Sequence, residues 1–487
     1  MEQPASSSKY DAVVVGAGPN GLAAAIVLAR AKRSTLLIEA NGTAGGGART
    51  HELTLPGFLH DACSSVHPLG RASPLFRTLG LERYGLQWID SPTPAAHALS
   101  EQTTVLLERS VEATGEQFGP DDAAAYRELV LPFVERFEML LPMLLAPLRV
   151  PARPLLMARF GFPALRSMEG LARDLFRGPR PGALLAGIAA HAMLPLDRVV
   201  TASFGLVLAI AGHAVGWPIA RGGSQAITDA LVACFRAHGG ELQLGCPVER
   251  LEQLPAARAY VFDVTPKQLL SIAGDRLPAS YVRRLQRFRY GPGVFKMDWA
   301  LSAAIPWRDP RCARACTVHL AGDLAEVSAA ESAVHEGKIA ERPFVLLVQP
   351  SLFDATRAPA GGHTAWAYCH TPHGSELDAS AAIEAQIERF APGFRELILA
   401  RSQRNAVQMQ AYNSNYVGGD INGGLADIRQ LFFRPMLKAD PYATPVPNLF
   451  LCSSSTPPGG GVHGMCGYWA AHSVLRRVFD VHLERFV

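Results

Sequence analysis

An apolar run followed by three spaced glycines near the start of the chain limits its possible folds more than any other feature. Residues 13–15 are three valines without polar interruption, which is typical of a strand buried on both faces of a parallel sheet. The glycines follow directly as G-x-G-x-x-G and are Gly16, Gly18 and Gly21. An alanine-rich stretch, 22–30, favours a helix, and a second apolar run, 35–38, ends at Glu39. The pattern predicts the βαβ unit of a Rossmann-like, dinucleotide-binding domain.

Each residue of this unit has a physical task in holding a dinucleotide. Gly16 permits the tight turn out of the strand, Gly18 leaves room for a pyrophosphate beside the backbone, and Gly21 lets the helix pack closely on the sheet. The N-terminus of the helix presents free N–H groups and the positive end of its dipole to the phosphates. Glu39 lies about 20 residues past the glycines, where an acid accepts hydrogen bonds from a ribose. These contexts favour a dinucleotide site over a glycine-rich turn without a ligand.

Length, charge and cysteine spacing narrow the class of protein. A chain of 487 residues is too long for one small core, so we expect two or three domains. The net charge of +3 argues against nucleic acid as a partner, and residues 1–9 lack the apolar core of a signal peptide, so we expect a cytoplasmic protein. The eight cysteines form no C-x-x-C pair, which favours reduced thiols and predicts no metal site. The oligomeric state stays open.

The order of patterns along the chain predicts two interleaved domains. Strand-like and glycine-rich stretches predict a dinucleotide-binding α/β domain built from three segments, which are 1–72, 212–290 and 425–487. The intervening segments, 73–211 and 291–424, predict a substrate domain of the α+β class with a mixed sheet and a helical cap. The most apolar window, 199–217, contains His213 and is shorter than a membrane span, so we expect a buried helix beside an apolar ligand.

Two further glycine-rich loops accompany the first one. Residues 42–50 carry Arg49, whose guanidinium fork suits a diphosphate. At the other end of the chain, the apolar run 448–452 leads into the loop 453–467 and a helix-forming stretch, which is a second strand–loop–helix unit. A glycine-rich helix start again permits close approach of a ligand at the positive end of a helix dipole. Both loops therefore predict further ligand contacts.

Together these motifs resemble the phytoene-desaturase-like group of FAD-dependent oxidoreductases, within the amine-oxidase-type flavoproteins. The motifs that carry the resemblance lie at both ends and in the middle of the chain, at 16–21, Glu39, 46–50, 56–58, Gly222, Gly223, 448–452, 458–462 and 464–467. The resemblance implies FAD, with its diphosphate at the first glycines and its isoalloxazine ring over the C-terminal loop. The implied FAD contacts are Gly16, Gly18, Pro19, Asn20, Gly21, Glu39, Ala40, Gly46, Gly47, Arg49, Thr50, Val248, Ser454, Gly460, Gly461, Val462, His463 and Gly464.

Two departures from the usual pattern affect what the resemblance implies. A glycine that commonly follows the last strand is replaced by Ser453, which predicts a differently shaped loop. The chain has no second G-x-G-x-x-G for NAD(P), which favours oxygen or a quinone as the electron acceptor.

Three residues are candidates for a chemical role beside the flavin. His463 lies inside the C-terminal loop, where it could act as a base or as a hydrogen-bonding partner within the loop. His213 lies in the apolar window, and Tyr468 begins the last helix-forming stretch. For these two residues a buried packing role is the alternative to a catalytic one.

The expected function is that of a desaturase or dehydrogenase, which takes a hydride from a small, apolar or secondary-metabolite substrate to form C=C or C=N. Three alternatives stay open, namely an amine or amino-acid oxidase, a redox-neutral flavin isomerase, and a non-catalytic binding or escort protein. Between residues 149 and 180, seven arginines but only two acids are interleaved with apolar residues. This segment predicts either peripheral contact with an anionic membrane or a helical cap whose arginines face water.

Overall fold

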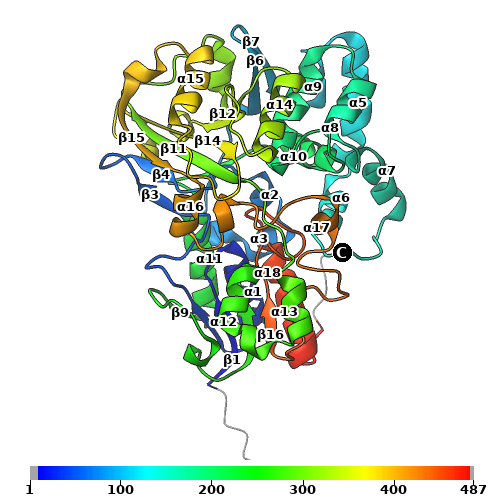
Figure 1. Ribbon diagram of the computed structural model, residues 1–487, viewed down its shortest axis with the longest axis vertical. Coiled ribbons are helices and arrows are strands. Elements are labelled where there is room, and N and C mark those ends of the chain that lie inside the picture. Colours follow the sequence, from blue (N-terminus) through cyan, green and yellow to red (C-terminus); the bar gives the residue numbers. More distant parts are fainter. Residues whose placement is uncertain (1–8, 483–487) are drawn as a thin grey trace, which may run out of the picture.

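Two sheets organise the computed structural model, which describes residues 9–482 (Figure 1). The smaller sheet is wholly parallel, and β1 lies at its centre. Its five strands in spatial order are β16 (Leu449–Leu451), β10 (Ala257–Phe262), β1 (Tyr10–Val15), β2 (Thr35–Ile38) and β9 (Glu241–Gln243). Val14 of β1 is opposite Leu37 on one side and Val261 on the other, and all three are fully buried. The central position explains the uninterrupted valine run.

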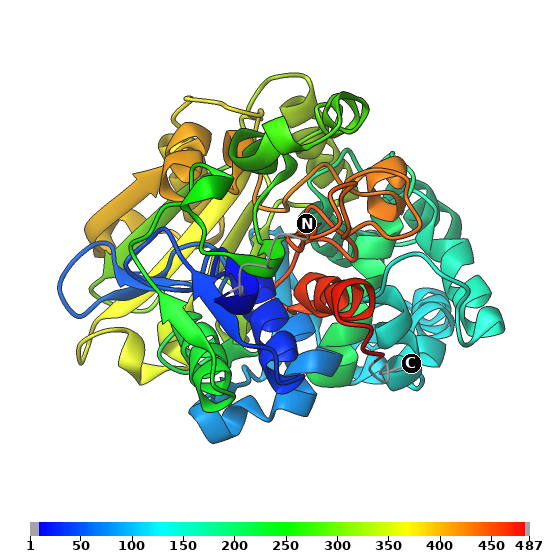
Figure 2. The same ribbon diagram turned by 90° about the horizontal axis from the view of Figure 1, so that it is seen from below.

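Helices cover both faces of this sheet. They are α1 (Pro19–Arg30), α11 (Gln225–Ala237), α12 (Pro266–Ala273), α13 (Ala279–Leu285) and α18 (Met465–Val478). The helices α1, α11 and α18 pack on the face that presents Val14, while α12 and α13 pack on the face that presents Val13. In Figure 2, α18 (red) lies beside α1 (blue). Gly467 permits this contact, because a Cβ there would lie 1.8 Å from the carbonyl oxygen of Asn20.

The larger sheet is mixed and is built from the segments 73–211 and 291–424. Its seven strands in spatial order are β15 (Ile398–Arg404), β11 (Gly293–Leu301), β14 (His363–Thr371), β13 (Val345–Val348), β12 (Ala315–Leu320), β6 (Thr93–Ser100) and β7 (Thr103–Leu107). Only β12 and β6 pair in parallel. Residues of β14 alternate between two cores, with Trp366 and Tyr368 on one face and Ala365 and Ala367 on the other. The first face is the one turned toward the helical cap.

A helical cap stands beside the larger sheet (Figure 1). Its main helices are α5 (Pro120–Val134), α6 (Phe137–Leu144), α7 (Pro154–Ala164), α8 (Met168–Leu175), α9 (Pro179–Ala189) and α10 (Thr201–Val215). The apolar window predicted as a buried helix is α10, and its central residues Leu206, Ala209 and Ile210 are at most 1% exposed. Within residues 9–482, no helix has the length and apolarity needed to cross a bilayer.

Shorter elements connect the two sheets and the cap. Two small antiparallel pairs are β3 (Thr50–Glu52) with β4 (Leu59–Asp61), and β5 (Trp88–Ile89) with β8 (Ile219–Ala220). The remaining α-helices are α2 (Pro68–Arg71), α3 (Pro74–Leu79), α4 (Val111–Gly115), α14 (Leu324–His335), α15 (Ser380–Phe390), α16 (Ala406–Tyr412) and α17 (Ile428–Phe432).

The fold class predicted from the sequence, an α/β Rossmann-like domain with an interleaved α+β domain, is confirmed. All strands of the parallel sheet fall within the segments 1–72, 212–290 and 425–487, and all strands of the mixed sheet fall within 73–211 and 291–424.

Candidate functional site

One cavity of about 1060 Å³ runs from the first glycine turn into the helical cap. Its walls come from every part of the fold. Gly18 and Asp263 belong to the edge of the parallel sheet, Trp366 and Tyr368 to the mixed sheet, and Phe204 to α10. The carboxyl ends of parallel strands at such an edge are where open α/β sheets bind ligands. The cavity therefore joins this edge of the parallel sheet to an apolar space beside the cap.

The glycine turn has the close packing that its sequence predicts. Gly16 has a φ of +97°, and a Cβ there would lie 2.9 Å from the carbonyl oxygen of Asp263. A Cβ on Gly18 would lie 2.7 Å from Oδ2 of Asp263, and one on Gly21 would lie 1.9 Å from the carbonyl oxygen of Gly16. Gly18, Pro19 and Asn20 line the cavity, so the bare backbone of the turn is open to a ligand.

Glu39 directly follows β2 and lies beside this turn. Its Oε2 accepts a hydrogen bond from the N–H of Ala17 at 2.8 Å, and its Oε1 accepts from the backbone and side-chain nitrogens of Asn41 at 2.9 and 2.7 Å. The residue is 6% exposed and does not line the cavity, and neither does the exposed Ala40. These bonds fix the carboxylate at the tip of the strand, where the sequence places a ribose partner.

Asp263 is a buried acid at the glycine turn that sequence reasoning missed. It follows β10, and its Oδ2 accepts a hydrogen bond of 2.8 Å from the N–H of Gly21. Burial raises the pKa of this carboxyl to about 7. The negative charge of Glu39 also raises this pKa, whereas the hydrogen bond from the N–H of Gly21 lowers it. The signal in the sequence was an acid directly after a buried strand. Recognising it required knowing that β10 lies next to β1, because Gly21 and Asp263 are 242 positions apart.

The C-terminal loop forms the floor of the cavity beside the start of α18. Ser454, Gly460, Gly461, Val462 and His463 line the cavity, as the sequence predicts for a ligand-contacting loop. Gly464 caps α18 at a φ of +68°, and it packs behind the loop rather than on the cavity. The amino ends of α1 and α18 thus meet the same cavity, and both contribute positive dipole potential there.

His463 is held as a neutral ring within this loop. Its Nδ1 accepts a hydrogen bond of 3.0 Å from the N–H of Met465, and its carbonyl oxygen accepts one of 2.7 Å from Ser73. Burial lowers the pKa of the ring to about 4, against the opposing effect of the backbone of Gly460. Because Nδ1 is an acceptor, the ring proton lies on Nε2. These contacts favour the loop-bonding role of His463 over the role of a base.

The loop at residues 42–50 reaches the cavity through its glycines. Gly46 and Gly47 line the cavity, whereas Arg49 and Thr50 do not. Arg49 Nε donates to the carbonyl oxygen of Gly46 at 2.9 Å, and its guanidinium lies 4.6 Å from the ring centre of Tyr412. Arg49 therefore supports the loop from behind.

A buried ion pair connects this loop to the segment 291–424, which carries part of the mixed sheet. Arg357 Nη2 lies 2.8 Å from Asp61 Oδ2, and both side chains are inaccessible to solvent. Thr50 donates to Asp61 Oδ1 at 2.7 Å, and the N–H of Ser224 donates to the same oxygen at 2.8 Å. Burial alone would raise the pKa of Asp61, but Arg357 and the hydrogen bonds hold it well below its usual range. Thr50 is thus a link between domains through Asp61.

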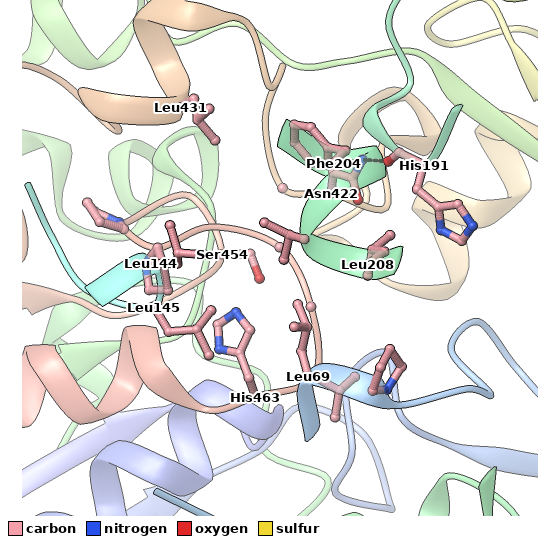
Figure 3. Close-up of a pocket in the computed structure, with 18 of the residues that line it drawn as sticks. Leu69, Leu144, Leu145, His191, Phe204, Leu208, Asn422, Leu431, Ser454 and His463 are labelled. Carbon is pink, nitrogen blue, oxygen red and sulfur yellow. Dashed lines mark hydrogen bonds between the residues drawn. The ribbon is translucent and has the colours of Figure 1, made fainter. Parts of the chain in front are cut away.

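The far half of the cavity is apolar. Side chains from the cap supply most of its wall, and they include Met143, Leu144, Leu145, Met157, Phe160, Phe204, Val207 and Leu208. Figure 3 shows Leu69, Leu144, Leu145 and Leu208 around the space beside Ser454 and His463. Polar side chains interrupt this wall at several positions, among them Arg149, Ser203, Thr317, Asn422 and His191. His191 Nε2 lies 3.1 Å from His319 Nε2. Burial lowers the pKa of His191 to about 3, so this ring is neutral as well.

Three further predicted residues, His213, Tyr468 and Val248, also lie away from the cavity. Both ring nitrogens of His213 are engaged, Nε2 by the Tyr126 hydroxyl at 2.7 Å and Nδ1 by the Arg109 carbonyl at 3.3 Å. Tyr468 packs against His472 with ring centres 4.3 Å apart. For these two, the packing alternative agrees better with the structure than a catalytic role does. Val248 is half-buried, and it lies in the loop after β9.

Comparison with known proteins finds oxidoreductases among the relatives of this chain. Residues 14–79 match the family described as an NAD(P)-binding Rossmann-like domain. Over 96% of its length the chain is 27% identical to pyridine nucleotide-disulfide oxidoreductase domain-containing protein 2 of Rattus norvegicus, covering 94% of that protein. It is 23% identical to the lycopene-forming phytoene desaturase of Paracoccus sp., with 95% of this chain and 96% of that protein covered.

Solved structures share the same fold. An oxidoreductase from Methanosarcina mazei superimposes with a TM-score of 0.64 at 14% identity, over 96% of this chain and 99% of that one. Cyclohexylamine oxidase from Brevibacterium oxydans superimposes with a TM-score of 0.57 at 16% identity, over 96% of this chain and 98% of that one. These identities are low, so the likeness establishes the fold and leaves the reaction to be argued from the site.

Proposed function

We propose that this chain, an oxidoreductase of the FAD-dependent amine-oxidase type by its relatives and its fold, removes a hydride from a lipophilic substrate to form C=C or C=N. Oxygen or a quinone is the proposed final electron acceptor. The observation that carries the proposal is the single cavity that joins the glycine turn to the apolar wall of the cap. When bound, FAD supplies the hydride acceptor, and the protein supplies binding, orientation and exclusion of water.

The residues at the parallel sheet fit FAD. Gly18 has no room for a side chain beside Asp263, and its backbone is open to the cavity. Asn20 lines the cavity, and its buried Oδ1 has no hydrogen-bond partner among the described residues, as expected for an atom that awaits a ligand. Glu39, held beside the turn by the N–H of Ala17, would accept hydrogen bonds from the ribose. Gly460 and Gly461 would lie under the flavin ring, at the positive end of α18, where negative charge is stabilised.

The cap residues would orient the substrate and exclude water from its surroundings. Leu145, Phe160 and Phe204 surround the space beyond the C-terminal loop with apolar surface, which favours an apolar ligand and excludes water. His463 keeps its ring proton on Nε2 and holds the loop through Nδ1, so its proposed role is to shape the floor of the site. An apolar wall is compatible with hydride removal, because this reaction depends more on the position of the reacting carbon than on charged side chains around it.

An amine oxidase is the second candidate, favoured by the fold shared with cyclohexylamine oxidase. The lining argues against a cationic substrate. Among the described residues that line the cavity, Asp263 is the one carboxylate, and it lies at the glycine turn rather than in the apolar half. A protonated amine in that half would be desolvated without an anionic partner, which is costly.

Anaerobic titration of the purified protein separates these functions. The protein should be yellow, and its oxidised-flavin absorption should bleach on addition of an apolar polyene or hydroaromatic compound but not of simple amines. Bleaching by amines alone would favour the oxidase. Repeated turnover of the substrate without any acceptor would favour the isomerase, and a colourless protein that FAD cannot reconstitute would leave only a binding or escort role. Gly18→Val is the matched control, because it should remove the flavin signal with the cap intact.

A further inference from the structure

Helix α7 is apolar on two faces, although it borders solvent. Its inner face presents Met157, Phe160 and Ala164 to the cavity. On its outer face, Leu155 and Phe162 are 87% and 82% exposed. A surface helix of a soluble protein normally keeps such residues on one face only. The spacing of seven residues places Leu155 and Phe162 on the same outer stripe.

The cavity reaches the surface at this helix. Leu148, Phe162 and Leu165 line the cavity, yet they are 64%, 82% and 45% exposed. A small groove of about 200 Å³ adjoins Leu148 on its other side and adds Phe433 and Leu437, which are 39% and 68% exposed. These exposed side chains form a patch, here called the mouth patch, around the opening of the apolar half of the cavity.

Positive charge surrounds the mouth patch. Arg153, which directly precedes α7, and Arg159 on α7 are exposed, and their side chains make no ion pair or hydrogen bond with any residue in the range 9–482. Farther along, Arg166 pairs with Asp174, and Arg173 pairs with Glu169 at 2.5 Å. The acids of this segment are therefore already neutralised, and the charge beside the mouth patch is left unbalanced.

We propose that α7 and the loop before it dock peripherally on an anionic lipid bilayer. Leu155, Phe162 and Leu148 would enter the boundary between headgroups and acyl chains, while Arg153 and Arg159 would extend to lipid phosphates. The mouth of the cavity would then open into lipid. Entry of an apolar substrate from the bilayer rests on the proposed function, but the docking itself does not.

A bilayer fits this patch better than a second copy of the chain. In a symmetric dimer through α7, the apolar stripe and the unpaired arginines of both copies would meet, and like charges would face each other. An anionic bilayer instead offers both apolar depth and negative charge. Figure 1 also shows α7 projecting at the edge of the molecule, on the side opposite β15, where a flat surface can reach it.

Flotation of the FAD-loaded full-length protein with vesicles tests the docking. We expect binding at low salt to vesicles of equal parts phosphatidylglycerol and phosphatidylcholine, and weak binding to phosphatidylcholine alone or at high salt. The change Arg153→Ser/Arg159→Ser should weaken binding about 30-fold. The change Leu155→Ser/Phe162→Ser should weaken it at least about 100-fold. The matched control is Leu377→Ser/Leu399→Ser, which alters two residues that are 52% and 54% exposed beside α15 and in β15.

The outcomes separate docking from the redox proposal. Unchanged flavin content and melting temperature in all variants show that the fold is retained. No binding of the wild type to anionic vesicles, or equal binding by the α7 variants and the control, would overturn the proposal. A dimer in solution that becomes monomeric in Leu155→Ser/Phe162→Ser would also overturn it, because the patch would then be an interface between copies. Flavin reduction is read in solution without vesicles, so its failure has no bearing on the docking result.

Discussion

Asp263 offers the sharpest test of the geometry at the glycine turn. Its carboxyl is 6% exposed, accepts the N–H of Gly21 and lies against the position where a Cβ of Gly18 would be. An ionised carboxylate beside a diphosphate would repel it, whereas a protonated one would not. The change Asp263→Asn keeps the shape and an acceptor oxygen for Gly21, and it removes the titration.

The size and sign of the effect follow from the pKa of this carboxyl. Its pKa is about 7 in the folded chain and 3.8 when exposed, and this difference corresponds to about 4 kcal/mol of folding free energy. Because the folded pKa is raised, the native state holds the proton more tightly. The stabilisation of the folded state by the protonated Asp263 carboxyl is fully present below the pKa of the unfolded chain, and it is lost as the pH rises through the pKa of the folded chain. Between about pH 5 and 7, the wild type should lose roughly 2–3 kcal/mol of stability relative to Asp263→Asn.

Urea unfolding of both proteins across this pH range measures the effect directly. The difference in unfolding free energy between Asp263→Asn and the wild type should grow with pH, and FAD should bind the wild type more weakly as pH rises but bind the variant with little pH dependence. Asp197→Asn is the control, because Asp197 is exposed and distant from the turn. Parallel stability curves for the wild type and Asp263→Asn would refute the account of this carboxyl.

Three further predictions concern the cofactor turn, the link between domains and the C-terminal loop. Gly18→Val should abolish flavin retention and leave the circular dichroism spectrum unchanged, because even the Cβ of a side chain at this position would lie 2.7 Å from Asp263 Oδ2. A variant that is still yellow would contradict this prediction. Arg357→Leu should lower the unfolding free energy by about 3–5 kcal/mol, since it leaves the buried Asp61 unpaired, and adding Asp61→Asn should restore part of the loss in urea titrations. His463→Gln should leave the shape of the pH–rate profile unchanged above about pH 5, because a ring with a pKa of about 4 is neutral there; loss of an inflection near neutral pH would assign proton transfer to His463.

The first βαβ unit could be predicted because its signals are local. The valine run, the three glycines and Glu39 lie within one stretch of chain, and each acts on its neighbours in sequence. The C-terminal loop was predictable for the same reason, since Gly460 and Gly461 lie within one short stretch that leads from β16 to the start of α18.

The parts that could not be predicted depend on neighbours far apart in the chain. Asp263 matters because β10 pairs with β1, and Arg357 matters because its loop meets Asp61 across the domain boundary. His213 and Tyr468 lie close in sequence to residues of the site, but the rotation of their helices turns them into the core. A sequence pattern gives the spacing of residues along a helix, and only packing decides which face meets the cavity.

Reduction of bound flavin under anaerobic conditions tests the central claim most directly. We expect the purified protein to carry FAD. An apolar substrate able to lose a hydride should bleach the oxidised absorption, and the colour should return on admission of oxygen or a quinone. A protein that neither retains FAD nor takes it up after reconstitution, although it is folded, would contradict the account.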